Sequence, residues 1–299
     1  MAKPVTMQDV QSLLSRGRNA EAVEAYREFL RREPGHLAAW NGLALLLRRL
    51  GRVEESEAAI AEAARAEAAK YEDPAAVQRF LAAAGRAGKT PATAPATFVT
   101  KLFDDAAERF ETLLKHDLAY RGPELLLEAV TRVHGESPRD LDVLDLGCGT
   151  GLAGEVFRAA ARRLDGVDLS SKMLERAAAK RVYESLAQAD VVEHLVRTSE
   201  RYDLILAADV FIYVGGLAPV FAAARRVLRP DGLLAFTAEV MDSEGDDLQL
   251  QAVRRYAHSR GYLARTAAEA GFAIPLLEVA ALRTESTRPV RAWIAVMHA

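Results

Sequence analysis

Apolar residues recur at helical spacing in the first part of the chain and then gather into short continuous runs. Residues 1–88 are rich in alanine, leucine, glutamate and arginine, and the apolar residues recur at the spacing of amphipathic helices. From residue 143 onward, short apolar runs alternate with segments of helical spacing, the pattern of parallel strands joined by helices. We therefore expect an all-helical first part and an α/β second part.

The helical part repeats itself. Gly17-Arg18, Gly51-Arg52 and Gly85-Arg86 recur every thirty-four residues, and the segment resembles tetratricopeptide repeats, which are helix pairs of that length. The third unit, residues 74–88, has only one convincing helix. Because such units bury their apolar faces by stacking, we expect them to dock on the second part or to self-associate. A groove for a protein partner and a structural cap both remain open.

A linker separates the two parts. Residues 89–97 are small residues and prolines, which suit an extended connection. An amphipathic helix is predicted over residues 98–118, a break at 120–123, and a further helix over 124–133. The predicted domains are therefore residues 1–88 and 98–299.

A strand, a tight turn and a helix are predicted around residues 143–164. Gly147, Gly149 and Gly151 alternate after the apolar run and are followed by helical spacing from Leu152 to Leu164. Glycines permit unusual backbone angles and let a ligand approach the main chain. A dinucleotide fingerprint needs glycine where Leu152 stands, and no G-K-[ST] of a P-loop occurs.

Acidic residues end the predicted strands. Asp145, Asp168, Asp190 and Asp209 fall at or near the ends of runs at residues 143–146, 164–168, 186–190 and 201–209. In an open α/β sheet, ligands bind outside the carboxyl ends of the strands. Asp168 can accept both hydrogen bonds of a ribose diol. A fifth strand is predicted over residues 233–237, and two more over 273–282 and 291–297.

These motifs together resemble class I S-adenosylmethionine (SAM) methyltransferases over residues 98–299. The resemblance implies a doubly wound Rossmann-like α/β fold with a seven-stranded sheet, a terminal antiparallel hairpin, and SAM as cofactor. The order of the parts resembles bacterial predicted methyltransferases with tetratricopeptide repeats, a family that implies no settled substrate. The residues that the resemblance assigns to the cofactor are Asp145, Gly147, Cys148, Gly149, Gly151, Asp168, Leu169, Met173, Ala189, Asp190 and Asp209.

Several of these residues have a second interpretation. Asp190 would bond the adenine amino group or cap the helix at residues 191–196, and both roles can hold together. Cys148, the only cysteine, is a reactive thiol or a small residue tolerated in a tight loop.

Methyl transfer requires alignment of the nucleophile with the departing sulfur, and a base only when the nucleophile arrives protonated. Asp209, Tyr213 and His258 are the catalytic candidates. His258 has a near-neutral ordinary pKa, but it is alternatively a surface residue beside three arginines. Residues 255–260 are expected on a helix, with Arg255 or Arg260 anchoring an acidic substrate group. The candidate acceptor residues are Tyr120, Arg121, Tyr213, Arg255, Tyr256 and His258.

Composition narrows the partners. Residues 1–97 carry 14 Lys/Arg and 12 Asp/Glu, which leaves 25 and 30 for residues 98–299. A net charge of −5 argues against a nucleic-acid substrate. The six histidines are scattered, so no metal site is expected. The N-terminus lacks the apolar core of a signal peptide, no apolar run is long enough to span a membrane, and a cytoplasmic location fits.

The sequence thus predicts methyl transfer from SAM to the oxygen, nitrogen or sulfur of a small molecule. Two alternatives remain open: a SAM-binding adaptor, and a methyltransferase whose protein substrate docks on the repeats. An NAD-linked oxidoreductase is a weaker alternative, since the glycine spacing disfavours it.

Overall fold

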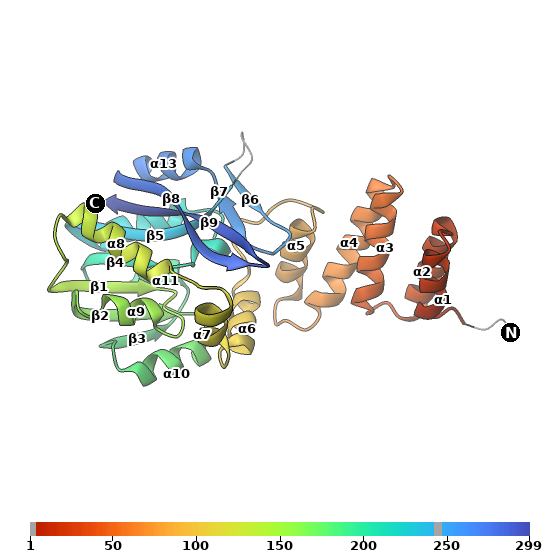
Figure 1. Ribbon diagram of the computed structural model, residues 1–299, viewed down its shortest axis with the longest axis horizontal. Coiled ribbons are helices and arrows are strands. Elements are labelled where there is room, and N and C mark those ends of the chain that lie inside the picture. Colours follow the sequence, from red (N-terminus) through yellow and green to blue (C-terminus); the bar gives the residue numbers. More distant parts are fainter. Residues whose placement is uncertain (1–3, 242–246) are drawn as a thin grey trace. The chain divides into compact units, whose positions relative to one another are not determined.

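The chain forms two compact units. The computed structural model describes residues 4–241 and 247–299. The first unit is Met1–Pro91 with Leu250–Arg254, and the second is Ala92–Gln249 with Arg255–Ala299. Figure 1 shows helices in the first unit, and a sheet with helices in the second. Among the described residues, no helix is both long and apolar enough to cross a membrane.

The first unit consists of consecutive antiparallel helices. Gly17 and Gly51 adopt φ values of 70° and 74° between paired helices, left-handed conformations that favour glycine. In the third repeat this conformation moves to Arg86, with φ 68°. The helices are α1 (Met7–Ser15), α2 (Asn19–Arg32), α3 (Leu37–Arg49), α4 (Val53–Ala68) and α5 (Pro74–Ala84).

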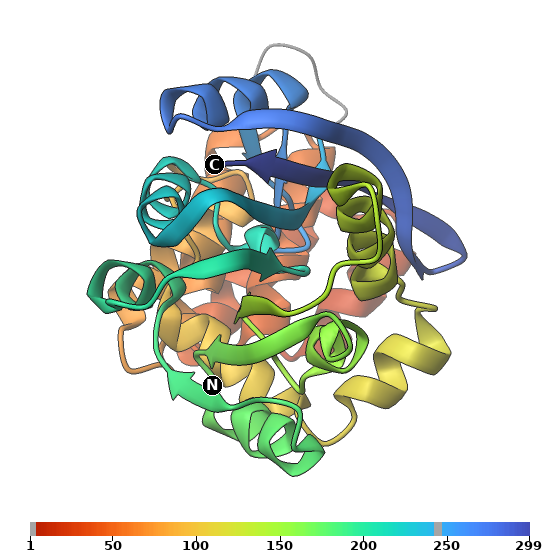
Figure 2. The ribbon, with the colours of Figure 1, turned by 90° about the vertical axis from the view of Figure 1, so that its left-hand side faces the viewer.

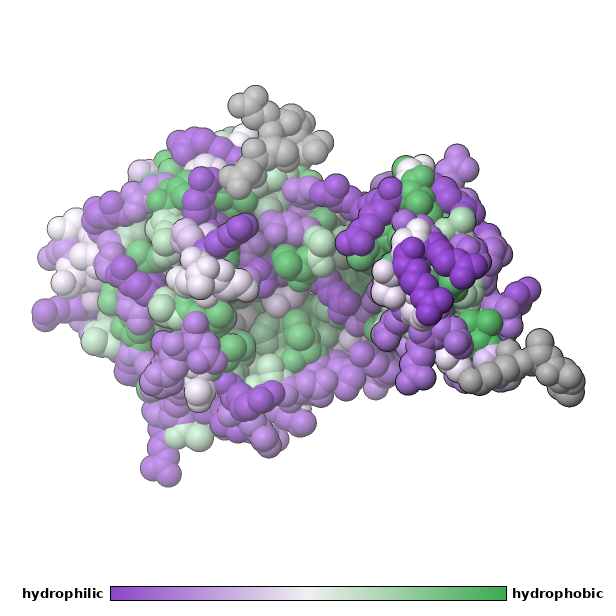
Figure 3. All heavy atoms as spheres, turned by 45° about the vertical axis from the view of Figure 1, so that its right-hand side comes forward, coloured by the Kyte–Doolittle hydropathy of each residue, from purple (hydrophilic) through white to green (hydrophobic). Residues whose placement is uncertain are grey.

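Close backbone approach fixes the stacking of these helices. A Cβ at Gly42 of α3 would lie 2.3 Å from the hydroxyl of Tyr26 on α2, so the phenol packs directly against the backbone of α3. Ser56 of α4 donates a buried 2.8 Å hydrogen bond to the carbonyl of Ala44 on α3. The surface of these helices is mainly hydrophilic in Figure 3, with apolar side chains at intervals.

The second unit is built on a mixed sheet. Its strands run in the order β3-β2-β1-β4-β5, all parallel, and β5 then pairs with antiparallel β9, which pairs with β8. The carboxyl end of β5 also pairs with β7. The strands are β1 (Leu141–Leu146), β2 (Ala161–Asp168), β3 (Ser185–Gln188), β4 (Tyr202–Ala207), β5 (Leu228–Val240), β6 (Leu248–Leu250), β7 (Tyr256–His258), β8 (Ala273–Glu285) and β9 (Arg288–His298).

Helices cover both faces of this sheet. Helices α8 and α9 pack on one face around Leu126 and Phe157, while α11, α12 and α13 cover the other around Phe221. Figure 2 shows the two layers with the strands between them. The helical segments are α6 (Ala96–Ala106), α7 (Phe110–Thr112), η1 (Leu113–Asp117), α8 (Gly122–His134), α9 (Leu152–Phe157), α10 (Ser171–Lys180), α11 (Val191–Arg197), η2 (Phe211–Tyr213), α12 (Ala218–Val227) and α13 (Arg260–Glu269).

The structure confirms the doubly wound sheet and its terminal antiparallel hairpin, and it corrects several details. The helix predicted over residues 152–164 ends at Phe157, because its last residues belong to β2. The predicted helix over 98–118 breaks after Ala106 into α7 and the π-helical turn η1. The prediction that residues 255–260 share one helix is wrong, since 256–258 form β7. Short strands β6 and β7 extend the predicted seven.

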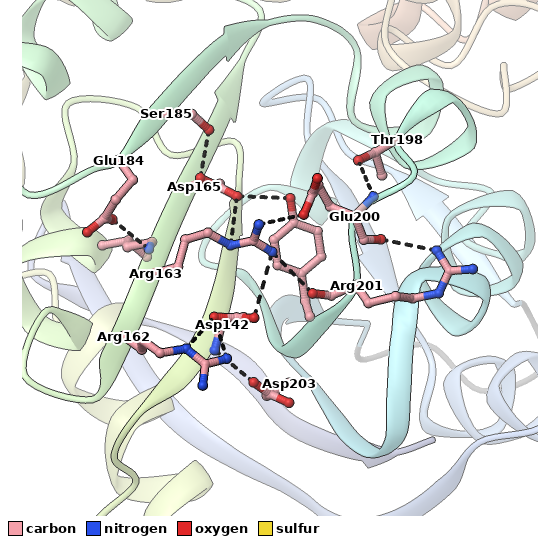
Figure 4. A network of polar contacts seen from close by, with 12 residues as sticks. Asp142, Arg162, Arg163, Asp165, Glu184, Ser185, Thr198, Glu200, Arg201 and Asp203 are labelled. Carbon is pink, nitrogen blue, oxygen red and sulfur yellow. Dashed lines mark hydrogen bonds and ion pairs between the residues drawn. The ribbon is translucent and has the colours of Figure 1, made fainter.

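A charged network ties the amino ends of the central strands together (Figure 4). Asp142 of β1 is 6% exposed and accepts from Arg162 at 3.1 Å and Arg229 at 2.7 Å. Arg229 also donates to Asp203 at 2.8 Å, and Asp203 accepts from the backbone N–H of Asp142. Although burial alone would raise the pKa of Asp142, the bonds from Arg229 and Arg162 lower it below its usual value.

Replacing Asp142 should therefore destabilise the second unit. Asp142→Ala leaves Arg229 and Arg162 without their shared acceptor, and we expect a loss of about 2–3 kcal/mol in unfolding free energy by urea titration. Glu193→Ala is the matched control, since Glu193 pairs with Arg197 on an exposed helix face, where about 0.5 kcal/mol is typical. Equal losses in the two variants would show that the network does not stabilise the sheet.

Candidate active site

A cavity of about 380 Å³ opens at the carboxyl ends of the central strands, a size typical of ligand sites. Its walls come from the glycine turn after β1, the loops after β2 to β4, the segment from residue 93 to 123, and β8. The polar and charged side chains in its wall are Thr93, Tyr120, Asp145, Thr150, Asp168, Asp190, Asp209, Tyr213, Arg255, Arg283 and Glu285.

The turn between β1 and α9 depends on glycine. Gly147 and Gly149 have φ values of 61° and 54°. A Cβ at Gly147 would lie 2.6 Å from a methyl carbon of Val210, which leaves no room for a side chain. A Cβ at Gly149 would instead project toward Phe110 in the cavity wall, 3.8 Å away. The turn thus lets a ligand lie directly against the main chain.

Asp168 connects this turn to the next one. Its Oδ2 accepts from the N–H of Gly149 at 2.9 Å, and its Oδ1 accepts from the N–H of Ser170 at 2.8 Å. Burial raises the pKa of Asp168, and these backbone bonds oppose the shift. The carboxylate also lines the cavity. Its orientation is therefore fixed before a ligand arrives.

Asp145 is held by a side-chain hydroxyl, whereas Asp168 is held by backbone N–H groups. Its side chain is 1% exposed and accepts a 2.7 Å hydrogen bond from the hydroxyl of Tyr183. Burial raises the pKa of Asp145 to about 7, the bond from Tyr183 opposes the shift, and the charge of Asp168 adds to it. The carboxyl group therefore changes charge near neutral pH.

Asp190 both caps a helix and faces the cavity. Its Oδ1 accepts from the N–H groups of Val192 and Glu193 at 2.9 and 3.1 Å. The residue also lines the cavity. The capping role predicted from the sequence is present, and it leaves Oδ2 available for a ligand.

A buried charge cluster lies on the other side of the cavity. Arg283, 4% exposed, donates to Asp209, Glu239 and Glu285. Arg255 pairs with Glu239 at 2.8 Å and with Glu285 at 2.9 Å. Arg283, Glu239 and Glu285 were missed by the sequence analysis. A charge inside an otherwise apolar strand was the available signal, because Glu239 ends the run from Leu233 and Arg283 follows Leu282.

Tyr120 and Tyr213 line the cavity on the side of this charge cluster. Burial raises the pKa of Tyr120 and of Tyr213 above the ordinary value, and the charge of Asp209 adds to both shifts. Both phenols are therefore uncharged at neutral pH. The ring of Phe103 lies edge-on to Tyr213 with centroids 5.4 Å apart.

The described structure brings most of the predicted residues to the cavity wall. From the cofactor set these are Asp145, Gly147, Cys148, Gly149, Asp168, Leu169, Asp190 and Asp209, and from the acceptor set Tyr120, Tyr213 and Arg255. The predicted residues outside the wall are Gly151, Met173, Ala189, Arg121, Tyr256 and His258.

His258 lies in the protein interior, outside the cavity wall. It is fully buried on β7, and its Nε2 donates to the carbonyls of Val214 and Gly215 at 3.1 and 3.0 Å. Burial lowers its pKa to about 4, so the ring is neutral at pH 7. The surface position that the sequence analysis allowed is wrong, and the geometry gives His258 no access to the cavity as a base.

The remaining residues outside the wall also have local roles. Gly151 caps α9, and Met173 is fully buried on α10. Tyr256 is fully buried, with its ring against Gly215. Arg121 is exposed and pairs with Glu128 at 3.4 Å.

Burial raises the pKa of the Cys148 thiol far above its ordinary value, which argues against a reactive thiol.

The segment before α8 closes over the cavity and is held by polar contacts. Asp104 of α6 accepts a 2.5 Å hydrogen bond from Ser170. Lys180 of α10 pairs with Glu111 of α7 at 2.8 Å. Ala94 donates from its backbone to the carbonyl of Tyr213 at 2.9 Å. These contacts position the apolar wall that the segment contributes.

Comparison with known proteins agrees with this architecture. Residues 144–236 match the family described as "Methyltransferase domain", and residues 10–72 match "Tetratricopeptide repeat". The chain therefore combines a methyltransferase domain with a tetratricopeptide-repeat region, as the sequence resemblance predicted.

The chain is also similar to individual methyltransferases. A malonyl-[acyl-carrier protein] O-methyltransferase of Enterobacter lignolyticus is 31% identical over 126 residues, 42% of this chain and 50% of that protein. The chain spans about half the length of the curated relatives that it matches first.

Two solved structures share the fold. A 1,6-didemethyltoxoflavin-N1-methyltransferase of Burkholderia thailandensis, solved with its substrate and S-adenosylhomocysteine (SAH), aligns with a TM-score of 0.55, 18% identity and coverage of 70% of this chain and 92% of that one. A [4+2]-cyclase aligns with a TM-score of 0.56, 17% identity and coverage of 70% and 97%. The class I methyltransferase fold is thus confirmed.

The raised pKa of Asp145 predicts a pH-dependent stability. A carboxyl whose folded-state pKa lies above its unfolded value stabilises the fold at low pH, and this contribution is lost as pH rises from about 4 to about 7. Asp145→Asn removes the charge and keeps an acceptor for Tyr183. We expect the ligand-free variant to gain on the order of 1–3 kcal/mol at pH 8.

Thermal unfolding at pH 8 and at pH 5 tests this prediction, because the gain should shrink at the lower pH. Asp105→Asn is the control, since Asp105 is exposed and pairs with Lys101 on α6. A loss of stability at pH 8, or a gain that does not depend on pH, would contradict the assignment.

Proposed function

We propose that the chain transfers a methyl group from SAM to a small-molecule acceptor. The observation that carries the proposal is Asp168, whose buried carboxylate bonds Gly149 of the glycine turn and borders the same cavity. A fixed carboxylate beside a turn that exposes main chain is the arrangement by which βαβ units hold a ribose. The match to the methyltransferase domain supports the same ligand.

The residues present fit SAM. Asp168 and Leu169 would hold the ribose side, Asp190 would accept from the adenine amino group, and the turn at Gly147 and Gly149 would lie against the methionyl part. Bound SAM supplies a methyl carbon activated by the positive sulfonium. The acidic side chains in the wall suit that charge.

Positioning is the main contribution of the chain to the reaction. The acceptor's lone pair forms the new bond to the methyl carbon, the carbon–sulfur bond breaks, and its electron pair stays on sulfur. A protonated acceptor then gives its proton to solvent water. Asp209 is engaged by Arg283 through both oxygens, at 3.0 and 2.8 Å, so this carboxylate already has a partner. Holding the acceptor in line with sulfur supplies the catalysis.

A single substitution tests the cofactor assignment. Asp168→Asn removes a charged acceptor that would bond the ribose, so SAH affinity should fall by about 2 kcal/mol, or roughly 30-fold. Calorimetric titration with SAH, with NAD in a parallel titration, measures this change, and Asp105→Asn serves as the control. Unchanged SAH affinity would refute the ribose role, and NAD binding in place of SAH would refute the cofactor.

We also propose that the first unit engages a protein, in its simplest form a second copy of the chain. The tetratricopeptide match and the exposed side chains of Leu45 and Val53, 54% and 53% exposed, support this proposal. Sedimentation over roughly a hundredfold concentration range tests it. A mass above 32.5 kDa that grows with concentration is expected, and a constant 32.5 kDa would contradict self-association.

A further inference from the structure

The acceptor side of the cavity contains arginines whose charge is already compensated. The side chain of Arg283 is 2% exposed. Its Nη1 donates to both carboxylate oxygens of Asp209, its Nε donates to Glu285 at 2.7 Å, and its Nη2 donates to Glu239. The carboxylates thus surround the guanidinium and leave it little capacity to bind a further anion.

Arg255 is also paired with two of these carboxylates. Its Nε lies 2.8 Å from Glu239, and its Nη2 donates to Glu285 at 2.9 Å. Three carboxylates therefore share two guanidinium groups, and the cluster has a formal charge of −1. A buried cluster of this kind is stable only while its charges remain paired.

The charged groups along the whole cavity wall also disfavour an anionic acceptor. Along the described wall, the cations are Arg255 and Arg283, and the anions are Asp145, Asp168, Asp190, Asp209 and Glu285. An incoming carboxylate would meet this acidic excess, in a partly buried space where charges are weakly screened. On the acceptor side, an incoming ammonium group would meet Asp209 and Glu285, which Arg283 already engages. It would also lose its hydration against apolar walls.

The rest of the acceptor side offers apolar surface and neutral hydroxyl groups. Val99, Leu114, Leu118 and Ile212 contribute aliphatic surface to the cavity. Tyr120 and Tyr213 add phenolic hydroxyl groups that stay protonated at neutral pH. Such a wall binds an apolar molecule and forms hydrogen bonds to an uncharged polar group on it.

We propose that the acceptor is an uncharged, largely apolar molecule with at least one hydroxyl or carbonyl group, and that the cluster of Asp209, Glu239, Arg255, Arg283 and Glu285 excludes carboxylates. The proposal rests on the proposed methyltransferase function and gives its acceptor a chemical class. It replaces the sequence expectation that Arg255 anchors an acidic substrate group.

Three probes of equal ring size test the proposal on the full chain. SAH is titrated first, and saturation by SAH establishes the cofactor site independently of the acceptor. The SAH complex is then titrated near neutral pH with 2-naphthol, 2-naphthoate and 2-naphthylmethylammonium. We expect 2-naphthol to bind at least about tenfold more tightly than either charged probe, because an unpaired charge would be buried.

Each of the other results would contradict either the proposed function or the proposed acceptor class. Failure of SAH to bind would contradict the proposed function itself. With SAH bound, equal or tighter binding of 2-naphthoate or of the ammonium probe would overturn the acceptor class. Absence of saturable binding of 2-naphthol would overturn it as well.

A charge-changing variant tests the role of the cluster. Glu285→Gln removes one negative charge and keeps an oxygen that can accept from Arg283. The ratio of 2-naphthoate to 2-naphthol affinity should rise about tenfold, a change of selectivity that partial unfolding would not produce. Glu278→Gln is the matched control, since Glu278 lies on the same strand and pairs with exposed Arg132. An unchanged ratio in Glu285→Gln would show that the cluster does not set the selectivity.

Discussion

The carboxylate of Asp168 is the interaction on which the site depends. Through Gly149 and Ser170 it joins the loop after β1 to the loop after β2, and Ser170 in turn bonds Asp104 of the covering helix α6. One side chain therefore sets the relative positions of the glycine turn, the start of α10 and part of the cavity cover. Because these bonds form within the chain, this side of the cavity is organised without a ligand, which favours tight binding.

Much of this arrangement could be predicted from local sequence. The strand–turn–helix at residues 141–157 and the acids at the ends of β2 and β4 follow from short-range patterns, since apolar runs and alternating glycines permit few backbone paths. The thirty-four-residue period predicted the helical repeats in the same way. Asp145, Asp168 and Asp190 reach the cavity because parallel strands end at one edge of a sheet.

Tertiary contacts decided what the local patterns could not. Residues 256–258 carry helical spacing but pair with the carboxyl end of β5, which buries His258. The helix after the glycine turn stops at Phe157, since the chain turns at residues 158–160 and enters β2 at Ala161. Arg283 and Glu239 stand 44 residues apart, so their pairing in the buried charge cluster could not be read from spacing.

The segment of residues 250–254 affects how the protein can be dissected. It begins at the last residue of β6, yet it belongs with the helical unit, where Arg254 donates to both carboxylate oxygens of Glu67 at 2.8 Å. The polypeptide therefore enters the helical unit twice, although the linker suggests a simple tandem. A gene fragment that starts after residue 91 would encode a peptide loop whose partners are missing.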